Sequence, residues 1–339
     1  MHTTTSQLRL FTPVEIGPIR LGHRVVMAPL TRLRSDQPGD VPNDLMAEYY
    51  GQRATNGGLI VTESAEITPD ASAYQGAPGI YCDAQVAGWR KVTSAVHAKG
   101  GYIFLQLWHS GRVSHVDLTG GVTPVGPSAV PTDGILVFTA KGPLTATPNR
   151  ALEAEEIPGI VEQYRRAAER AKAAGLDGIE VLAAGGYLLD QFLQDGANKR
   201  TDQYGGSPAN RSRLLLEVIE TVSAVWNPNR IGVRLSPSGT FNSISDNNPH
   251  ELFDYVAEAL NQFGLAYLHI IEPRVRGGEN LTDGQPVAAA RLRRIFTGTI
   301  IAAGGFDPQG ANGHRGSREC GLGRLWSPLH RESRPAQEN

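Results

Sequence analysis

Cysteine is scarce in this sequence of 339 residues, which has only Cys82 and Cys320, far apart and outside any Cys-x-x-Cys spacing. This scarcity argues against a disulfide framework and against a structural zinc site, and it is typical of a reducing cytosol. The nine histidines form no cluster with ligand spacing, which also disfavours metal catalysis. We interpret both thiols as small buried or incidental side chains.

Runs of like charge and long apolar runs are also missing. The formal net charge is -2 at pH 7, so the sequence carries no electrostatic footprint for nucleic acid or an anionic membrane. No apolar stretch reaches bilayer length, and the start, MHTTTSQLRLF, lacks the basic and apolar parts of a signal peptide. We therefore expect a soluble cytoplasmic protein, a monomer or small homo-oligomer, that acts on a small molecule and has no nucleic-acid or membrane partner.

Seven short apolar runs alternate with longer segments of helical period, at residues 24–29, 58–64, 102–108, 178–184, 231–237, 265–272 and 299–305. Between two of them, residues 157–174 predict a helix whose apolar face is made of Ile160, Tyr164, Ala167, Ala168 and Ala171. Such repeated βα units indicate an α/β fold with a parallel sheet. Continuous apolar strands fit a closed barrel and a doubly wound sheet equally well. A Rossmann-type dehydrogenase is disfavoured because no GxGxxG opens a helix after any run.

Residues 110–150 interrupt this alternation, because they are rich in Gly, Pro, Thr and Val and have no helical period. In a barrel they would form an insertion over the mouth at the C-terminal ends of the strands, where active sites lie. The alternative is a surface hairpin with no part in catalysis.

Residues with useful chemistry gather at the predicted C-terminal strand ends, among them Pro29, Leu30, Thr31, Gln106, Trp108, Tyr187, Arg234, Ala303, Gly304 and Gly305. A flavin needs an amide for its pyrimidine edge, a fixed cation near N1 and O2, and glycine backbone that admits a phosphate. Taken singly, each residue is better explained as half of an ion pair, a satisfied polar group or a turn. Their shared position is what indicates a flavin site.

Residues 186–213, GYLLDQFLQDGANKRTDQYGGSPANRSR, resemble the signature segment of the old yellow enzyme family. The resemblance extends over about residues 10–311, including RVVMAPLTRLRS, FLQLWHSGR and IGVRLSPSGTF, and is strongest to the bacterial branch of N-ethylmaleimide, nitrate-ester and morphinone reductases. It implies one (β/α)₈ TIM-barrel domain over residues 1–311 that binds FMN and is reduced by NADPH or NADH. It further implies hydride transfer from flavin N5 to activated C=C bonds of enones or maleimides, or to nitro and nitrate-ester groups.

Matched residue by residue, the resemblance implies that FMN is bound by Pro29, Leu30, Thr31, Ser64, Gln106, Arg234, Ala303, Gly304 and Gly305. It places Tyr74 and Trp108 among the pocket-lining aromatics. Tyr187 matches the catalytic proton donor, since a tyrosine hydroxyl with a pKa of about 10 is protonated at neutral pH. Without the resemblance, Tyr187 would be interpreted as a packing residue.

Two substrate-binding positions beside Tyr187 depart from the family pattern. Where the family has a His and, three residues on, an Asn or His, this chain has Leu182 and Gly185. In the family, these two side chains donate hydrogen bonds to the substrate's carbonyl or nitro oxygen. Losing one such donor typically costs about 10²- to 10³-fold in rate. We therefore predict weak or altered activity on conventional enones, and we interpret His109 as a structural histidine. Two alternatives stay open, a flavin-binding protein with only NAD(P)H oxidase activity and a nonfunctional truncated remnant.

The second departure is at residues 312–339, which have no apolar strand run and no amphipathic helix. They predict a disordered tail outside the family pattern, in place of the eighth strand. A frame starting one nucleotide into the codon for Asn312 can encode ADLVAFGR with permissible codons, which matches the missing strand and its phosphate-binding Gly-Arg. We therefore hypothesise a single-nucleotide frameshift near Ala311, in the gene or in the recorded sequence, which resequencing would decide. A chain that ends as written would leave an open strand edge and lose a phosphate contact.

Overall fold

The centre of the computed structural model, which describes residues 9–273 and 287–306, is a sheet of seven parallel strands. From edge to edge the strands follow chain order, as β3 (Val26–Met27), β4 (Leu59–Glu66), β5 (Tyr102–Trp108), β10 (Gly178–Ala183), β11 (Ile231–Leu235), β12 (Tyr267–Ile271) and β13 (Ile300–Ala303). Each predicted apolar run therefore overlaps one strand, and only β4 extends beyond its run, to Glu66. Because strand order never reverses, the sheet has the topology of a β/α barrel and not of a doubly wound fold.

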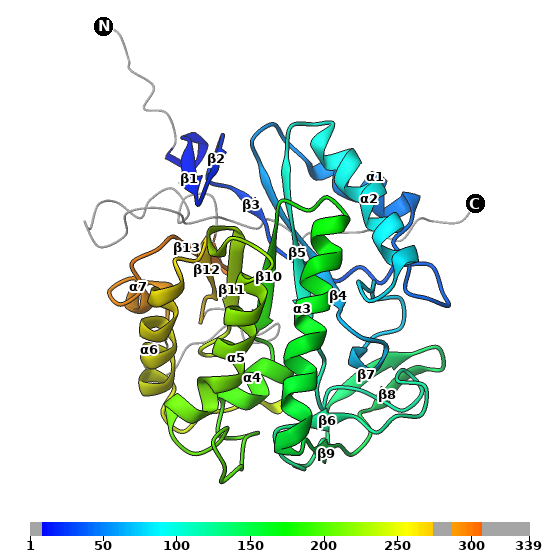
Figure 1. Ribbon diagram of the computed structural model, residues 1–339, viewed down its shortest axis with the longest axis vertical. Coiled ribbons are helices and arrows are strands. Elements are labelled where there is room, and N and C mark those ends of the chain that lie inside the picture. Colours follow the sequence, from blue (N-terminus) through cyan, green and yellow to red (C-terminus); the bar gives the residue numbers. More distant parts are fainter. Residues whose placement is uncertain (1–8, 274–286, 307–339) are drawn as a thin grey trace, which may run out of the picture.

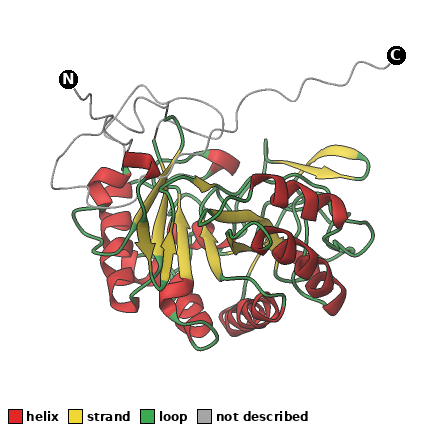
Figure 2. Ribbon diagram, turned by 90° about the horizontal axis from the view of Figure 1, so that it is seen from above, coloured by secondary structure: helices red, strands yellow, loops and turns green. Residues whose placement is uncertain are grey.

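Helices cover the outer side of this curled sheet (Figures 1 and 2), namely α1 (Asp44–Arg53), α2 (Asp83–His97), α3 (Ile157–Ala173), α4 (Leu188–Leu193), α5 (Pro208–Ser223), α6 (Pro249–Leu260) and α7 (Ala289–Leu292). Side-chain caps begin several of them: Asn43 accepts from the Met46 N–H of α1, and Ser207 accepts from the Asn210 N–H of α5. The predicted face of α3 is confirmed, since Ile160, Tyr164, Ala167, Ala168 and Ala171 are all buried.

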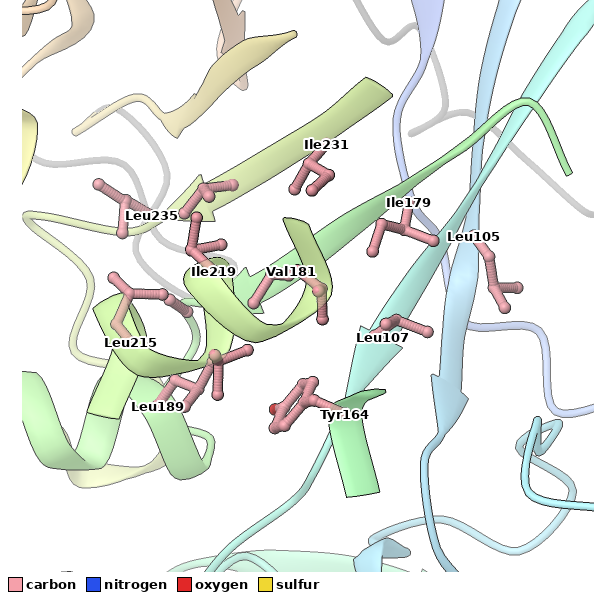
Figure 3. Packing of buried hydrophobic residues seen from close by; sticks show 14 of the residues in the cluster. Leu105, Leu107, Tyr164, Ile179, Val181, Leu189, Leu215, Ile219, Ile231 and Leu235 are labelled. Atoms are coloured by element: carbon pink, nitrogen blue, oxygen red, sulfur yellow. The ribbon is translucent and has the colours of Figure 1, made fainter. Parts of the chain in front are cut away.

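The main apolar core lies between the sheet and these helices. Figure 3 shows Ile179 and Val181 of β10 on the same side of the sheet as Tyr164 of α3 and Ile219 of α5. All four side chains are fully buried. Burial of side chains of this size stabilises a fold by about 1.5–3 kcal/mol each, before the loss of conformational entropy is counted.

A second apolar layer fills the inside of the sheet near the N-terminal ends of its strands. There the antiparallel hairpin of β1 (Val14–Ile16) and β2 (Ile19–Leu21) packs with Phe104 and Tyr267. Two strand glycines make room for these rings, because a Cβ on Gly178 would lie 2.4 Å from the Phe104 ring and one on Gly232 would lie 2.3 Å from the Tyr267 ring. This layer closes the interior below the polar residues described next.

Residues 110–150 form short strands and loops, with β6 (Val125–Gly126) paired to β9 (Arg150–Ala151) and β7 (Leu136–Thr139) forming a hairpin with β8 (Gly142–Thr145). The hairpin contacts a predicted pocket residue, since the Phe138 and Tyr74 rings are 5.8 Å apart. The insertion therefore packs against the Tyr74 ring through Phe138. Short 3-10 turns lie at Arg9–Phe11, Pro69–Ala71, Ala154–Glu156, Pro228–Arg230, Phe241–Ser243 and Asn261–Phe263.

The predictions for the C-terminus fall on residues 307–339, so the eighth strand, the domain boundary at residue 311 and the tail 312–339 lie outside the described residues. Within the described ranges, β3 and β13 form the two edges of the sheet. None of the helices in this part of the chain is long and apolar enough to cross a membrane. Over the same residues, no three His, Cys, Asp or Glu side chains are grouped as they would be to hold a metal ion.

Candidate active site

A cavity of about 180 Å³ opens at the C-terminal ends of strands β4, β5, β10, β11 and β12. Its walls include most of the predicted site, namely Pro29, Thr31, Ser64, Gln106, Trp108, Leu182, Gly185, Tyr187 and Arg234. Sequence reasoning missed three further lining residues, Ala184, Phe241 and Ile271. The residues predicted from several distant segments therefore meet at one place, which is the end of the barrel where active sites lie.

Five predicted residues lie outside the lining of this cavity. Tyr74 lies directly behind it, because its hydroxyl oxygen is 2.9 Å from that of Tyr187 and its ring stacks 5.9 Å from the Trp108 ring. Leu30 follows Pro29 in the segment after β3. Ala303 ends β13, and Gly304 and Gly305 follow it with φ of 105° and 69°, in the left-handed region that glycine enters without steric cost.

A β-bulge in β4 brings Ser64 into the cavity. The register between β4 and β5 shifts between Val61 and Ser64, so that both of these side chains face the interior of the barrel. Regular alternation from Val61 would have placed Glu63 there. Instead the Glu63 carboxylate points outward and accepts a hydrogen bond of 3.1 Å from the hydroxyl of Tyr50 on α1. The Ser64 hydroxyl donates to Oε1 of Gln106 at 2.5 Å.

A buried carboxylate stands behind these polar residues. Glu180 on β10 is fully buried and accepts hydrogen bonds from Nε2 of Gln106 at 2.6 Å and from Nδ1 of His269 at 2.9 Å. Burial by itself raises the pKa of Glu180, but His269, Arg234 and Gln106 together outweigh it, so the pKa lies below its ordinary value. Burial lowers the pKa of His269 and the Glu180 carboxylate opposes this shift, while the imidazole donates to Glu180 from Nδ1.

Arg234 on β11 supplies the fixed cation of the cavity. Burial lowers the pKa of its guanidinium and the Glu180 carboxylate opposes this, but an arginine remains charged at any pH of interest. Its Nε is buried and makes no hydrogen bond within the described residues. A cation with an unpaired donor, the Gln106 amide and the Ser64 hydroxyl lie in one cavity. The polar groups present therefore fit the pyrimidine edge of a flavin.

Beyond Pro29 and Thr31, the remaining wall of the cavity is mostly apolar. It consists of Trp108, Leu182, Ala184, Gly185, Phe241 and Ile271, with Tyr187 among them, and its polar groups are the Tyr187 hydroxyl and the Trp108 indole N–H, which has no partner within the described residues. The Tyr187 ring lies edge-on to Trp108, with centroids 5.1 Å apart. Burial raises the pKa of Tyr187 well above its ordinary value and Tyr74 adds to this shift, so the hydroxyl keeps its proton at neutral pH. Leu182 and Gly185 offer no side-chain donor, as their sequence predicts.

Two hydrogen bonds hold the backbone just before Tyr187 in place. Gly185 and Gly186 have φ of 69° and 74°, and their N–H groups donate to Oγ of Ser236 and to Oδ2 of Asp190, each at 2.8 Å. Asp190 is fully buried on α4, and this burial raises its pKa to about 6. These contacts fix the turn that presents Tyr187 at the start of α4.

Much of the signature segment 186–213 is therefore scaffold, with Tyr187 as its one member in the lining of the cavity. The buried guanidinium of Arg211 donates to the Leu193 carbonyl at 2.5 Å and also to the Asp246 carboxylate. It ties the end of α4 to the segment before α6. His109 is also outside the lining; its Nδ1 accepts from the Gly111 N–H at 3.0 Å, and burial lowers its pKa to about 4.

A family model described as the NADH:flavin oxidoreductase / NADH oxidase family matches residues 9–318. The chain belongs to this family. Morphinone reductase has a similar solved structure, with 44% sequence identity and a TM-score of 0.87 over 96% of this chain and 87% of that one. An old yellow enzyme homologue from Zymomonas mobilis is 38% identical, with a TM-score of 0.88 over 94% of this chain and 88% of that one.

Curated relatives of the family agree with these structures. A flavin oxidoreductase of Emericella nidulans is 43% identical over 325 residues, which cover 89% of this chain and 82% of the relative. The 12-oxophytodienoate reductase 1 of Oryza sativa subsp. japonica is 44% identical over 308 residues, covering 89% and 78%. The predicted family, the TIM-barrel class and the assignment to oxidoreductase enzymes are thereby confirmed. Family membership implies FMN as the cofactor and a nicotinamide as the reductant.

Proposed function

We propose that this protein is an FMN-dependent NAD(P)H oxidoreductase that reduces activated C=C bonds of enones or maleimides, or nitro and nitrate-ester groups, with Tyr187 as the proton donor. The observation that carries the proposal is that one cavity holds both a polar group set for a flavin and a protonated tyrosine hydroxyl. The first set comprises Ser64, Gln106 and Arg234. Either NADPH or NADH would serve as the reductant.

Each part of the cavity has a separate task in this proposal. Ser64, Gln106 and Arg234 would hold the pyrimidine edge of FMN, with Pro29, Leu30 and Thr31 beside the ring and Ala303, Gly304 and Gly305 toward the phosphate. Bound FMN would supply hydride transfer through its N5, with NAD(P)H as the source of the hydride and the C=C or nitro compound as its acceptor. The Tyr187 Oη–H protonates the neighbouring carbon of the acceptor. The Tyr74 hydroxyl lies 2.9 Å from the Tyr187 hydroxyl and would hold it in place.

The apolar wall at Leu182 and Gly185 limits this reaction. Negative charge builds on the carbonyl or nitro oxygen of the acceptor during hydride transfer, and neither side chain can donate a hydrogen bond to it. We therefore expect FMN reduction by NAD(P)H at an ordinary rate and slow reduction of enones. Ordinary family rates with cyclohexenone or N-ethylmaleimide would contradict the expected impairment.

The test uses the purified protein and the variant Tyr187→Phe. A visible flavin spectrum establishes cofactor binding, and anaerobic mixing with NADPH or NADH followed by cyclohexenone, N-ethylmaleimide or a nitrate ester separates the two half-reactions. In Tyr187→Phe, FMN binding and its reduction should be unchanged, whereas reduction of the C=C acceptors should slow by about 10²- to 10⁴-fold. Tyr164→Phe is the matched control, because the buried Tyr164 hydroxyl of α3 has no hydrogen-bond partner within the described residues.

A second candidate is favoured by the same apolar wall. A protein that binds FMN and reacts with NAD(P)H but cannot activate an acceptor oxygen would show only NAD(P)H oxidase activity. In that case oxygen consumption would proceed at one rate with and without added enone. A purified protein without a flavin spectrum would contradict both candidates. The remaining hypothesis would then be a nonfunctional truncated remnant.

A further inference from the structure

Two buried side chains behind the cavity have no part in the proposed chemistry. Glu180 and His269 are both fully buried, and their carboxylate and imidazole are joined by a hydrogen bond of 2.9 Å. They lie on β10 and β12, on either side of β11, which carries Arg234. A buried carboxylate is costly unless it is paired, so its place beside a ligand cavity calls for a specific role.

The first contact of Glu180 determines how the Gln106 amide is turned. An ionised carboxylate can only accept, so its 2.6 Å contact with Gln106 requires the amide nitrogen at that position. The amide oxygen is then directed to the Ser64 hydroxyl, 2.5 Å away. One N–H and one lone pair of Gln106 remain for a ligand in the cavity. If the amide were reversed, its oxygen would face the carboxylate, which is repulsive.

The second contribution of Glu180 is its charge. Glu180 and Arg234 lie on neighbouring strands inside the barrel, and each favours the charged form of the other. Arg234 is also in register with His269 across β11 and β12. Glu180 therefore offsets the positive charge that Arg234 presents to the cavity, and His269 fixes Glu180 through its Nδ1–H.

We propose that Glu180 and His269 are positioning residues for the flavin-binding side of the cavity: Glu180 orients the Gln106 amide and offsets the Arg234 charge, and His269 holds Glu180 in place. The inference rests on the proposed binding of FMN and adds the control of its reduction potential. A flavin gains negative charge on reduction, so an anion at Glu180 weakens the binding of the reduced form relative to the oxidised form.

The primary test measures the midpoint potential of the FMN-loaded protein, together with its FMN dissociation constant. Glu180→Gln removes the charge at nearly constant size, and the ratio of reduced to oxidised FMN affinity should rise about tenfold. That ratio corresponds to an increase of about 30 mV for a two-electron couple. Glu217→Gln is the control, because Glu217 on α5 also accepts a hydrogen bond, from the Tyr204 hydroxyl at 3.1 Å, but lies far from the cavity on the outer layer.

Substitutions of His269 separate positioning from general stability. His269→Gln keeps a donor for Glu180, so the midpoint potential should be close to that of the parent. The ratio of reduced to oxidised FMN affinity should therefore change by no more than about twofold. His269→Leu removes the donor, which favours protonation of Glu180, so the potential should move in the same direction as in Glu180→Gln. Both variants can lower the thermal unfolding temperature, but a purely structural role would leave the potential unchanged.

The possible outcomes distinguish this inference from the proposed function. Equal potentials for the parent, Glu180→Gln and His269→Leu would overturn the inference alone, even if the parent reduces enones. A parent protein that binds no FMN would overturn the inference together with the proposed function. A raised potential in Glu180→Gln and His269→Leu, with parental values in His269→Gln and Glu217→Gln, would support it, whatever acceptor the enzyme uses.

Discussion

The two sides of the cavity differ in the number of polar side chains that could bind a cofactor or a substrate. The cofactor side is formed by Ser64, Gln106 and Arg234. Behind it, hydrogen bonds join Ser64 to Gln106, Gln106 to Glu180 and Glu180 to His269. The acceptor side, formed by Trp108, Leu182, Ala184, Gly185, Phe241 and Ile271, offers only the Tyr187 hydroxyl and the Trp108 indole N–H. Both sides lie at the same strand ends and share the same scaffold.

This difference indicates that the requirements of the cofactor and of the acceptor can be met separately. Burying Glu180 and Arg234 is tolerable only because each favours the charged form of the other and because Gln106 and His269 donate to the carboxylate. Substituting one member leaves a buried charge without compensation. Replacing a donor by Leu182 on the acceptor side leaves no such charge. We therefore expect the cofactor side to be sensitive to single substitutions and the acceptor side to be open to change.

The largest expected effect is at Arg234. In Arg234→Gln the Glu180 carboxylate loses its cation and FMN loses a charge-assisted contact worth about 1.5–3 kcal/mol, so FMN affinity should fall about 100-fold. Titration of apoprotein with FMN, followed by flavin fluorescence, measures this. Arg230→Gln is the control, because Arg230 lies at the other end of β11 and donates to the Asp177 carbonyl at 2.7 Å. Equal FMN affinity in the parent and in Arg234→Gln would remove the basis of the comparison.

The second prediction concerns the acceptor side. Leu182→His places a donor on β10 where the wall has none, and the rate of enone reduction should rise about 10²-fold, with FMN binding unchanged. Leu182→Phe is the matched control, since it adds a ring without a donor. An equal gain in both variants would show that bulk, and not hydrogen bonding, limits the rate. Gly185 is a harder site to restore, because a Cβ there would lie 3.3 Å from the Tyr187 ring.

The sequence predicts the scaffold better than the details of the site. The strands are predictable because they are continuous apolar runs, and α3 because Ile160, Tyr164 and Ala171 repeat at helical spacing. The bulge in β4 cannot be predicted from the strand itself, because regular alternation of side chains would put Glu63 inside the barrel in place of Ser64. A register shift depends on pairing with β5, which a single strand does not reveal.

The members of the site that were missed have different explanations. Phe241 and Ile271 are apolar residues, and nothing in their local pattern distinguishes pocket lining from core. Glu180 and His269 did leave a signal, because each is an ionisable residue inside an otherwise apolar strand. Two such residues in separate strands of one barrel suggest a buried pair. The contact of Glu180 with Gln106 emerges only from the parallel pairing of β5 with β10.

The substitution with the smallest expected effect on FMN affinity and on rate is at Asp190, which supports the acceptor side by accepting from the Gly186 N–H at 2.8 Å. Because its pKa is raised to about 6 by burial, folding favours the protonated carboxyl, and this contribution to stability is lost as pH rises from about 4 through 6. Asp190→Asn imitates the neutral form, so its free energy of unfolding relative to the parent should increase between pH 4 and pH 8, by at most about 3 kcal/mol. Urea unfolding at both values measures this, with Asp133→Asn at an exposed loop as the control. A relative stability of Asp190→Asn that is equal at both values would mean that the carboxylate stays ionised in the folded protein, and that the turn before Tyr187 is held by an anion.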